Sequence, residues 1–134
     1  MARDLSLFLL LFSFGAQAQA NTKRIAVLEL SNPAGLTKQE VTYLSDLLRR
    51  LASSELAQNF LVIDKANVLE LLPPEKTLEE CIGACAVETG RLLQAAYIVT
   101  GDIIKFGKTL RVTIRIHDTR SGRLISSEVA RFPP

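Results

Sequence analysis

The 134-residue sequence has no tryptophan, one histidine and two cysteines, and these scarcities exclude several kinds of functional site. The two thiols are too few for a structural zinc site, and the histidine, His117, lies far from them in the sequence. Paired carboxylates, a glycine-rich phosphate loop, a His-x-x-x-His motif and a nucleophile elbow are also missing. We therefore expect no enzymatic activity, no cofactor and no metal.

Strong charge of either sign is missing as well. The formal net charge is +2 at pH 7, which is too small to predict a nucleic-acid partner or binding to an acidic membrane surface. The hydrophobic fraction of 48% is ordinary for a globular protein. These values predict one folded domain with an ordinary core and no nucleic-acid partner.

Residues 1–20 have the pattern of a secretory signal peptide, with an apolar run over residues 5–14 and small residues after it. The run has about half the length that a helix needs to span a bilayer, so a cleaved signal is favoured over a retained anchor. We expect cleavage after Ala18 or Ala20, no lipidation cysteine at the new N-terminus, and a single domain over residues 21–134 without a membrane segment. Periplasmic or secreted localisation follows.

Apolar periodicity predicts a strand-helix-strand unit in the first half of the chain. Residues 24–30 and 60–63 are short apolar runs of the kind found in buried strands. Between them, Thr37 and Glu40 have the spacing of a capping box, and an amphipathic stripe begins at Val41. A helical crossover makes the two strands parallel.

The second half of the chain predicts two helices and three strands. A short helix after Asp64 ends at a proline pair, and a helix over about residues 85–94 leads into a strand at 97–106 that contains Gly101. Residues 110–117 alternate strictly between apolar and polar, and the less apolar residues 123–131 form an edge strand. The order β-α-β-α-α-β-β-β predicts a mixed sheet of about five strands with helices mainly on one face, between the α/β and α+β classes.

The cysteine pair, Cys81 and Cys85, is predicted to form a disulfide because the compartment is oxidising. Gly83 between them allows the irregular turn that this spacing needs. The alternative is a redox-active pair, which usually has a different spacing. We expect the bond to fix where the following helix begins.

The polar side of the alternating strand is the candidate binding face. It carries Arg111, Arg115 and His117, and Lys105, Arg123 or Arg131 can extend it. Such a face is most often simply solvated. As a functional surface, it predicts an anionic partner, either an envelope polymer or an acidic protein surface.

Several motifs in this order resemble one protein family: RIAVLEL, FLVID, CAVETGRLLQAAYIVTGDI and IHDTRSGRLI. They are similar to the periplasmic α/β domain family that includes the amino-terminal part of TolB, the curli secretion lipoprotein CsgG and the related domain of LpoB. The resemblance covers residues 24–131 and implies the fold derived above. It carries over no functional residue, because the shared positions look structural.

The function implied by this resemblance is that of a non-enzymatic interaction or assembly adaptor of the bacterial cell envelope, whose partners are envelope proteins. The alternative hypothesis is a binding module for a small ligand or a glycan at the polar face of the sheet. The two hypotheses differ in whether the partner is a protein or a small molecule.

Overall fold

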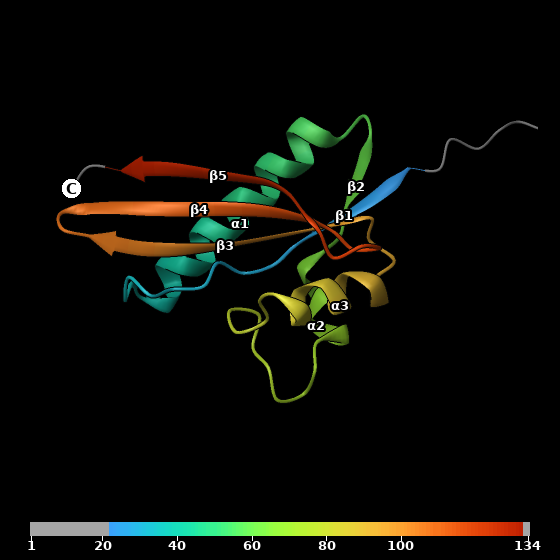
Figure 1. Cartoon of the computed structure of the whole chain (residues 1–134), viewed down its shortest axis with the longest axis horizontal. Coiled ribbons are helices and arrows are strands. Elements are labelled where there is room, and N and C mark those ends of the chain that lie inside the picture. Colours follow the sequence, from blue (N-terminus) through green and yellow to red (C-terminus); the bar gives the residue numbers. More distant parts are fainter. Residues whose placement is uncertain (1–21, 133–134) are drawn as a thin grey trace, which may run out of the picture.

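The computed structural model describes residues 22–132, and the predicted signal peptide, residues 1–20, lies outside this range. Figure 1 shows the elements along the chain. They are β1 (Lys23–Val27), α1 (Lys38–Leu56), β2 (Phe60–Val62), α2 (Lys65–Leu71), α3 (Ala84–Leu92), β3 (Tyr97–Phe106), β4 (Thr109–Asp118) and β5 (Leu124–Phe132).

One five-stranded mixed sheet organises the molecule, in the order β2-β1-β3-β4-β5. β1 runs parallel to both β2 and β3, and β3, β4 and β5 are antiparallel neighbours. The predicted element order, the parallel first pair and the edge position of β5 are thereby confirmed.

The helices divide between the two faces of the sheet. Leu48 of α1 packs with Ile25 and Val27 on one face, whereas Val68 of α2 and Val87 of α3 pack with alternate strand residues on the other. The long helix α1 lies on one face, while the two short helices cover the opposite face of β1 and the start of β3. The helices therefore do not gather mainly on one face as expected, because the central parallel strand β1 is buried on both faces.

The second strand is less buried than its apolar sequence predicted. Leu61 is 52% exposed, because β2 is an edge strand of only three residues and the short helices do not extend over it. The expectation of a fully buried strand at residues 60–63 is therefore wrong, since a short apolar run does not reveal whether a strand is central or at an edge.

Local signals set the start of α1 and the path of β3. The Thr37 hydroxyl accepts a bond from the Glu40 amide while the Glu40 carboxylate accepts one from the Thr37 amide, which confirms the capping box. Gly101 pairs regularly with Ile114 and forms no bulge; a Cβ atom there would lie 2.5 Å from the Thr113 carbonyl oxygen. This close approach of the neighbouring backbone is the reason for the glycine.

Within residues 22–132, none of the helices combines the length and apolarity needed to cross a bilayer.

Candidate functional site

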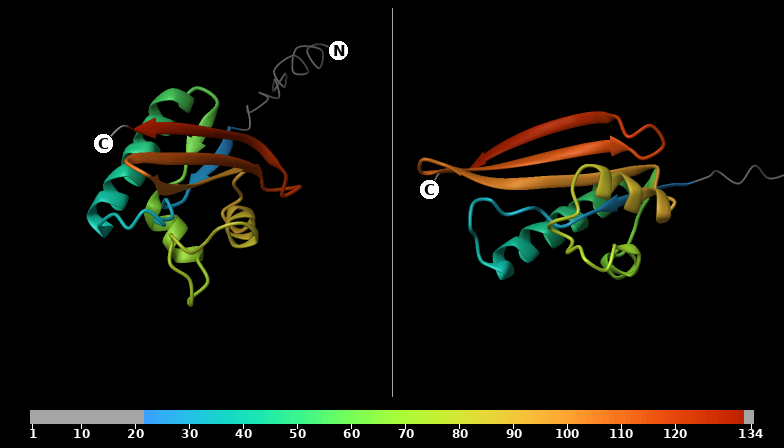
Figure 2. Two further views of the ribbon diagram at one scale, coloured as in Figure 1. Left: turned by 60° about the vertical axis from the view of Figure 1, so that its left-hand side comes forward. Right: turned by 60° about the horizontal axis from the view of Figure 1, so that its bottom comes forward.

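Beyond the start of β3 and the end of β4, where α3 lies, the half of the sheet built from β3, β4 and β5 has one face that no helix covers (Figure 2, right). The apolar residues of β4 pack toward α1, so the alternate residues point to the opposite side. We call this side the open face. Its members follow from the strand register: Asp102, Ile104, Arg111, Thr113, Arg115, Ser127, Val129 and Arg131.

Arg115, one of the predicted site residues, is already neutralised. Its Nη1 atom donates to Oδ2 of Asp102 on β3, and these two atoms lie 2.5 Å apart. Asp102 is 20% exposed and Arg115 is 38% exposed, so solvent weakens this ion pair only in part. A partner of the open face would therefore meet an occupied guanidinium at this position.

Arg111 lies further along the same face and is positioned by an aromatic ring. Its guanidinium carbon sits 4.6 Å from the centre of the Phe106 ring, within cation–π range. Its Nε group is buried without a hydrogen-bond partner among the described residues. The ring therefore holds the cation in place on this face.

Arg131 on β5 stands directly opposite Arg111 in the antiparallel register. Neither guanidinium forms an ion pair within residues 22–132. Like charges directly opposite each other on neighbouring strands repel. This pair is therefore the part of the open face that gains most from an anion.

His117 is placed at the border of the open face and is not freely solvated as the alternation predicted. It pairs with the buried Ile98 and lines a pocket of about 440 Å³ with Gly83, Val87 and Glu88. Its Nδ1 atom is buried and has no partner in the described part of the chain. The reason for the difference is tertiary, since α3 covers this end of the sheet.

Cys81 and Cys85 are joined by a disulfide, with their Cα atoms 5.1 Å apart. Gly83 is the N-cap residue of α3 and no side chain caps this helix start. Cys81 is 1% exposed, and its sulfur lies 3.5 Å from the Thr89 hydroxyl of α3. The bond ties the loop before α3 to the first turn of that helix.

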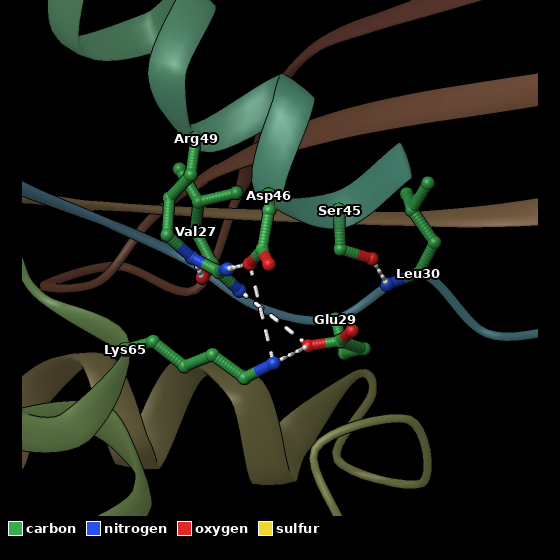
Figure 3. Close-up of polar contacts among 7 residues, drawn as sticks. All are labelled: Val27, Glu29, Leu30, Ser45, Asp46, Arg49 and Lys65. Atoms are coloured by element: carbon green, nitrogen blue, oxygen red, sulfur yellow. Dashed lines mark hydrogen bonds and ion pairs between the residues drawn. The ribbon is translucent and has the colours of Figure 1, made fainter. Parts of the chain in front are cut away.

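A second polar cluster, missed at the level of the sequence, lies where β1 ends (Figure 3). Because β2 is so short, no strand pairs with the backbone after Val27 on the side that faces away from β3. Side chains of α1 take its place: Arg49 Nε donates to the Val27 carbonyl at 3.1 Å, and the Leu30 amide donates to the Ser45 hydroxyl at 3.0 Å. Both α1 residues are buried.

Glu29 lies at the centre of this cluster with a side chain that is only 3% exposed. One carboxylate oxygen, Oε2, faces Lys65 Nζ at 3.1 Å and an Arg49 amino group at 3.6 Å. Arg49 also donates to Asp46 at 2.6 Å. The sequence contains two signals for this cluster. One is an acid, Glu29, inside the apolar run of residues 24–30. The other is the helical spacing of Val41, Ser45 and Arg49, which places two polar residues on the buried stripe of α1.

Groups of three or more histidine, cysteine or acidic residues placed to hold a metal do not occur within residues 22–132. Two acids have a perturbed pKa for structural reasons. Hydrogen bonds from the Thr37 backbone and hydroxyl lower the pKa of Glu40, and a bond from the Ser121 amide lowers that of Asp118. Both belong to caps and turns and not to a reactive site.

Comparisons with known proteins identify the fold. No protein-family model and no curated protein matches the sequence. Among solved structures, the LpoB C-terminal domain from Salmonella enterica matches at 14% identity and a TM-score of 0.68, over 84% of each chain. Lipoprotein GNA1162 from Neisseria meningitidis matches at 15% identity and a TM-score of 0.65, over 83% of this chain and 80% of that one.

TolB from Acinetobacter baumannii matches at 17% identity and a TM-score of 0.50, over 84% of this chain but 23% of TolB. The part of the sequence resemblance that concerns CsgG stays a prediction. At such low identities the likeness concerns the fold alone. The chain therefore has an LpoB-related α/β fold that also occurs within TolB.

Proposed function

We propose that this chain is a non-enzymatic interaction domain of a bacterial cell envelope, and that it binds an acidic protein surface through the open face. Two lines support the proposal. The fold is shared with the LpoB C-terminal domain and with lipoprotein GNA1162. The open face offers cationic and apolar groups together on a rigid sheet, which is the composition of a protein-binding surface.

The observation that carries the proposal is the unpaired cross-strand couple of Arg111 and Arg131. Guanidinium groups form two parallel hydrogen bonds to a carboxylate, and arginine is enriched at the energetic centres of interfaces. Removing the mutual repulsion of the two arginines would add to the gain on binding.

Apolar surface next to the arginines completes the docking area. Val129 lies between the two arginines and the rest of the open face and is 54% exposed. Phe106, whose ring lies under the Arg111 guanidinium, is 64% exposed. Burial of such side chains supplies the non-specific part of binding, while the arginines set orientation. An acidic partner with an apolar centre fits this surface better than a uniformly charged polymer does.

The test is a crosslinking pull-down from the periplasm, comparing the whole chain with the Arg111→Glu/Arg131→Glu variant. The reversal is expected to remove one or more specific crosslinked proteins. The matched control is Arg50→Glu/Arg120→Glu, which makes the same charge change at exposed sites outside the open face. If the same proteins crosslink equally to all three forms, the proposal is wrong.

The alternative, a small-ligand or glycan module at the sheet's polar face, makes a different prediction. A saturable thermal shift with envelope glycans that the same double reversal abolishes would show that the open face binds a carbohydrate instead of a protein. The proposal expects no such shift.

A further inference from the structure

A pocket beside the carboxyl end of β1 contains a buried hydrogen-bond acceptor that no described residue uses. Glu29 lines this pocket, and its side chain is 3% exposed. Neither carboxylate oxygen makes a hydrogen bond within residues 22–132, but Oε2 faces two cations whereas Oε1 faces none. Figure 3 shows the neighbouring cations on the side of Oε2. A buried polar atom without a partner costs free energy, so such an atom in a pocket calls for a donor.

The pocket has the size and position of a small-molecule site. Its volume is about 460 Å³, within the range of ligand pockets. It lies where the parallel strands end and the crossover helices α1 and α2 diverge, the usual place for ligands in sheets of this kind. Apolar side chains form one wall: Leu69, Leu72, Pro73, Pro74 and Leu78.

Charge decides which donor is missing at Glu29. Two acids, Glu29 and Asp46, and two bases, Arg49 and Lys65, form one connected cluster whose formal charges cancel. An incoming ammonium group would add a third cation beside Lys65 and be repelled. A neutral N–H or O–H donor satisfies Oε1 without disturbing this balance.

Charge also decides what the outer part of the ligand carries. Beyond the cluster, the pocket is lined by Lys38, Lys76 and Glu79, which together leave one positive charge at the rim. Both lysines are exposed and free to reach a ligand. The rim therefore favours a single negative charge.

From these features we infer that the pocket binds an N-acylated α-amino carboxylate. Its amide N–H donates to Glu29 Oε1, its side chain packs on the leucine and proline wall, and its carboxylate faces Lys38 and Lys76. A free acylated amino acid and the C-terminus of a peptide both carry this chemistry. The site is separate from the open face, so failure of either proposal leaves the other standing.

The test is an NMR titration of the ¹⁵N-labelled whole chain with three small probes. N-acetyl-leucine is expected to shift the amides of residues 65–79 and 38–42 and to leave β4 and β5 unchanged. Its methyl ester, which lacks the negative charge, and 4-methylpentanoate, which lacks the N–H, are each expected to bind at least about tenfold more weakly. Equal binding of all three probes would overturn the inference.

Two peptide arms identify the source of the ligand. Acetyl-Ala-Ala-Leu binding more tightly than N-acetyl-leucine would assign the site to a peptide C-terminus. Binding of N-acetyl-leucine without the tripeptide would assign it to a free acylated amino acid. Either result supports the shared chemistry, and the absence of shifts with both probes overturns it.

Variants test the two recognition groups separately. In Glu29→Gln, the amide oxygen must face Lys65 and Arg49, so the NH₂ group replaces Oε1 and meets the ligand N–H as a second donor. We expect at least about a tenfold loss of affinity. Because this variant alters a buried cluster, Lys76→Glu tests the exposed rim without that risk, with Lys108→Glu in the distant β3–β4 turn as its control. Unchanged affinity in the folded Lys76→Glu variant contradicts the inference.

Discussion

Gly90 lies on α3 where this helix packs against the end of β4, and only glycine fits at this position. A Cβ atom at this position would lie 2.6 Å from Cγ2 of Thr119 and 3.4 Å from Cβ of Ile98. Thr119 cannot easily move, since its hydroxyl donates to the Ala95 carbonyl. The helix thus accepts a residue of low helix propensity in exchange for close packing.

Gly90→Ala is expected to lower the free energy of unfolding by about 1–3 kcal/mol, although alanine favours helix by roughly 1 kcal/mol. The reason is the overlap with the Thr119 methyl group. Urea denaturation measures the effect. Adding Thr119→Ser removes that methyl group, keeps the hydroxyl, and should restore most of the loss; a double variant no more stable than Gly90→Ala would show that the overlap is not the cause.

The buried cluster gives a second prediction at single residues. Arg49→Leu is expected to destabilise the fold by about 3 kcal/mol, because the Val27 carbonyl loses its donor and Glu29 keeps only one cation. The adjacent and exposed Arg50 is the control, and Arg50→Leu should change stability by less than about 0.5 kcal/mol. Similar effects of the two substitutions in denaturant titrations would refute the assigned role of Arg49.

Among the elements, α3 depends on the disulfide before it. The helix has no side-chain cap, and its first intrahelical bond runs from the Val87 amide to the carbonyl of Gly83, which lies within the loop that the disulfide closes. Replacing both cysteines by alanine should cost at most about 2 kcal/mol, because the closed loop is very short. Hydrogen exchange at Val87 should accelerate more than exchange in α1; uniform acceleration would argue against a local role.

The β4–β5 turn has an acid whose charge stabilises it. The Ser121 amide donates to Asp118 at 2.9 Å and lowers the pKa of that carboxyl below 3.8. A lowered folded-state pKa means that the stabilisation is complete above the unfolded value and disappears as pH falls through the folded value. NMR titration of the Asp118 carboxyl should give a pKa below 3.8, and a value at or above it contradicts this role.

At this scale the sequence is informative wherever the signal is local. The alternation in β4 and the capping box of α1 depend on neighbouring residues, and both were predictable. The burial of Arg49 and Ser45 was not, because it depends on β2 being too short to cover the end of β1. The partial burial of His117 likewise depends on α3, which is remote in sequence.

Across the whole molecule, helices are distributed unevenly over one continuous sheet. β1 and the first part of β3 are covered on both faces and hold much of the core, whereas most of β4 is covered by α1 on one face only and β5 contributes no residue to the three core clusters. β5 is an edge strand, and Leu124, Ile125, Val129 and Phe132 on it are each about half exposed. Of these, Val129 belongs to the open face and adds apolar surface to the proposed interaction site.

The candidate site was partly predictable at this scale. Strand alternation placed Arg111 and Arg115 on one face, as the register confirms. The sequence did not show that Asp102 neutralises Arg115 or that Arg131 stands opposite Arg111, because cross-strand register is set by the turn and the irregularity near His117. These pairings place the centre of the proposed binding surface at Arg111 and Arg131 and leave Arg115 outside it.

Photo-crosslinking from single positions tests the central claim, that the open face is the interaction surface, most directly. A photoreactive residue is placed at Thr113 in the middle of the open face and, in a second protein, at the exposed Leu51 on α1. We expect a specific envelope protein to crosslink to position 113 and not to position 51. Crosslinks from position 51 alone, in two folded proteins, would contradict the account.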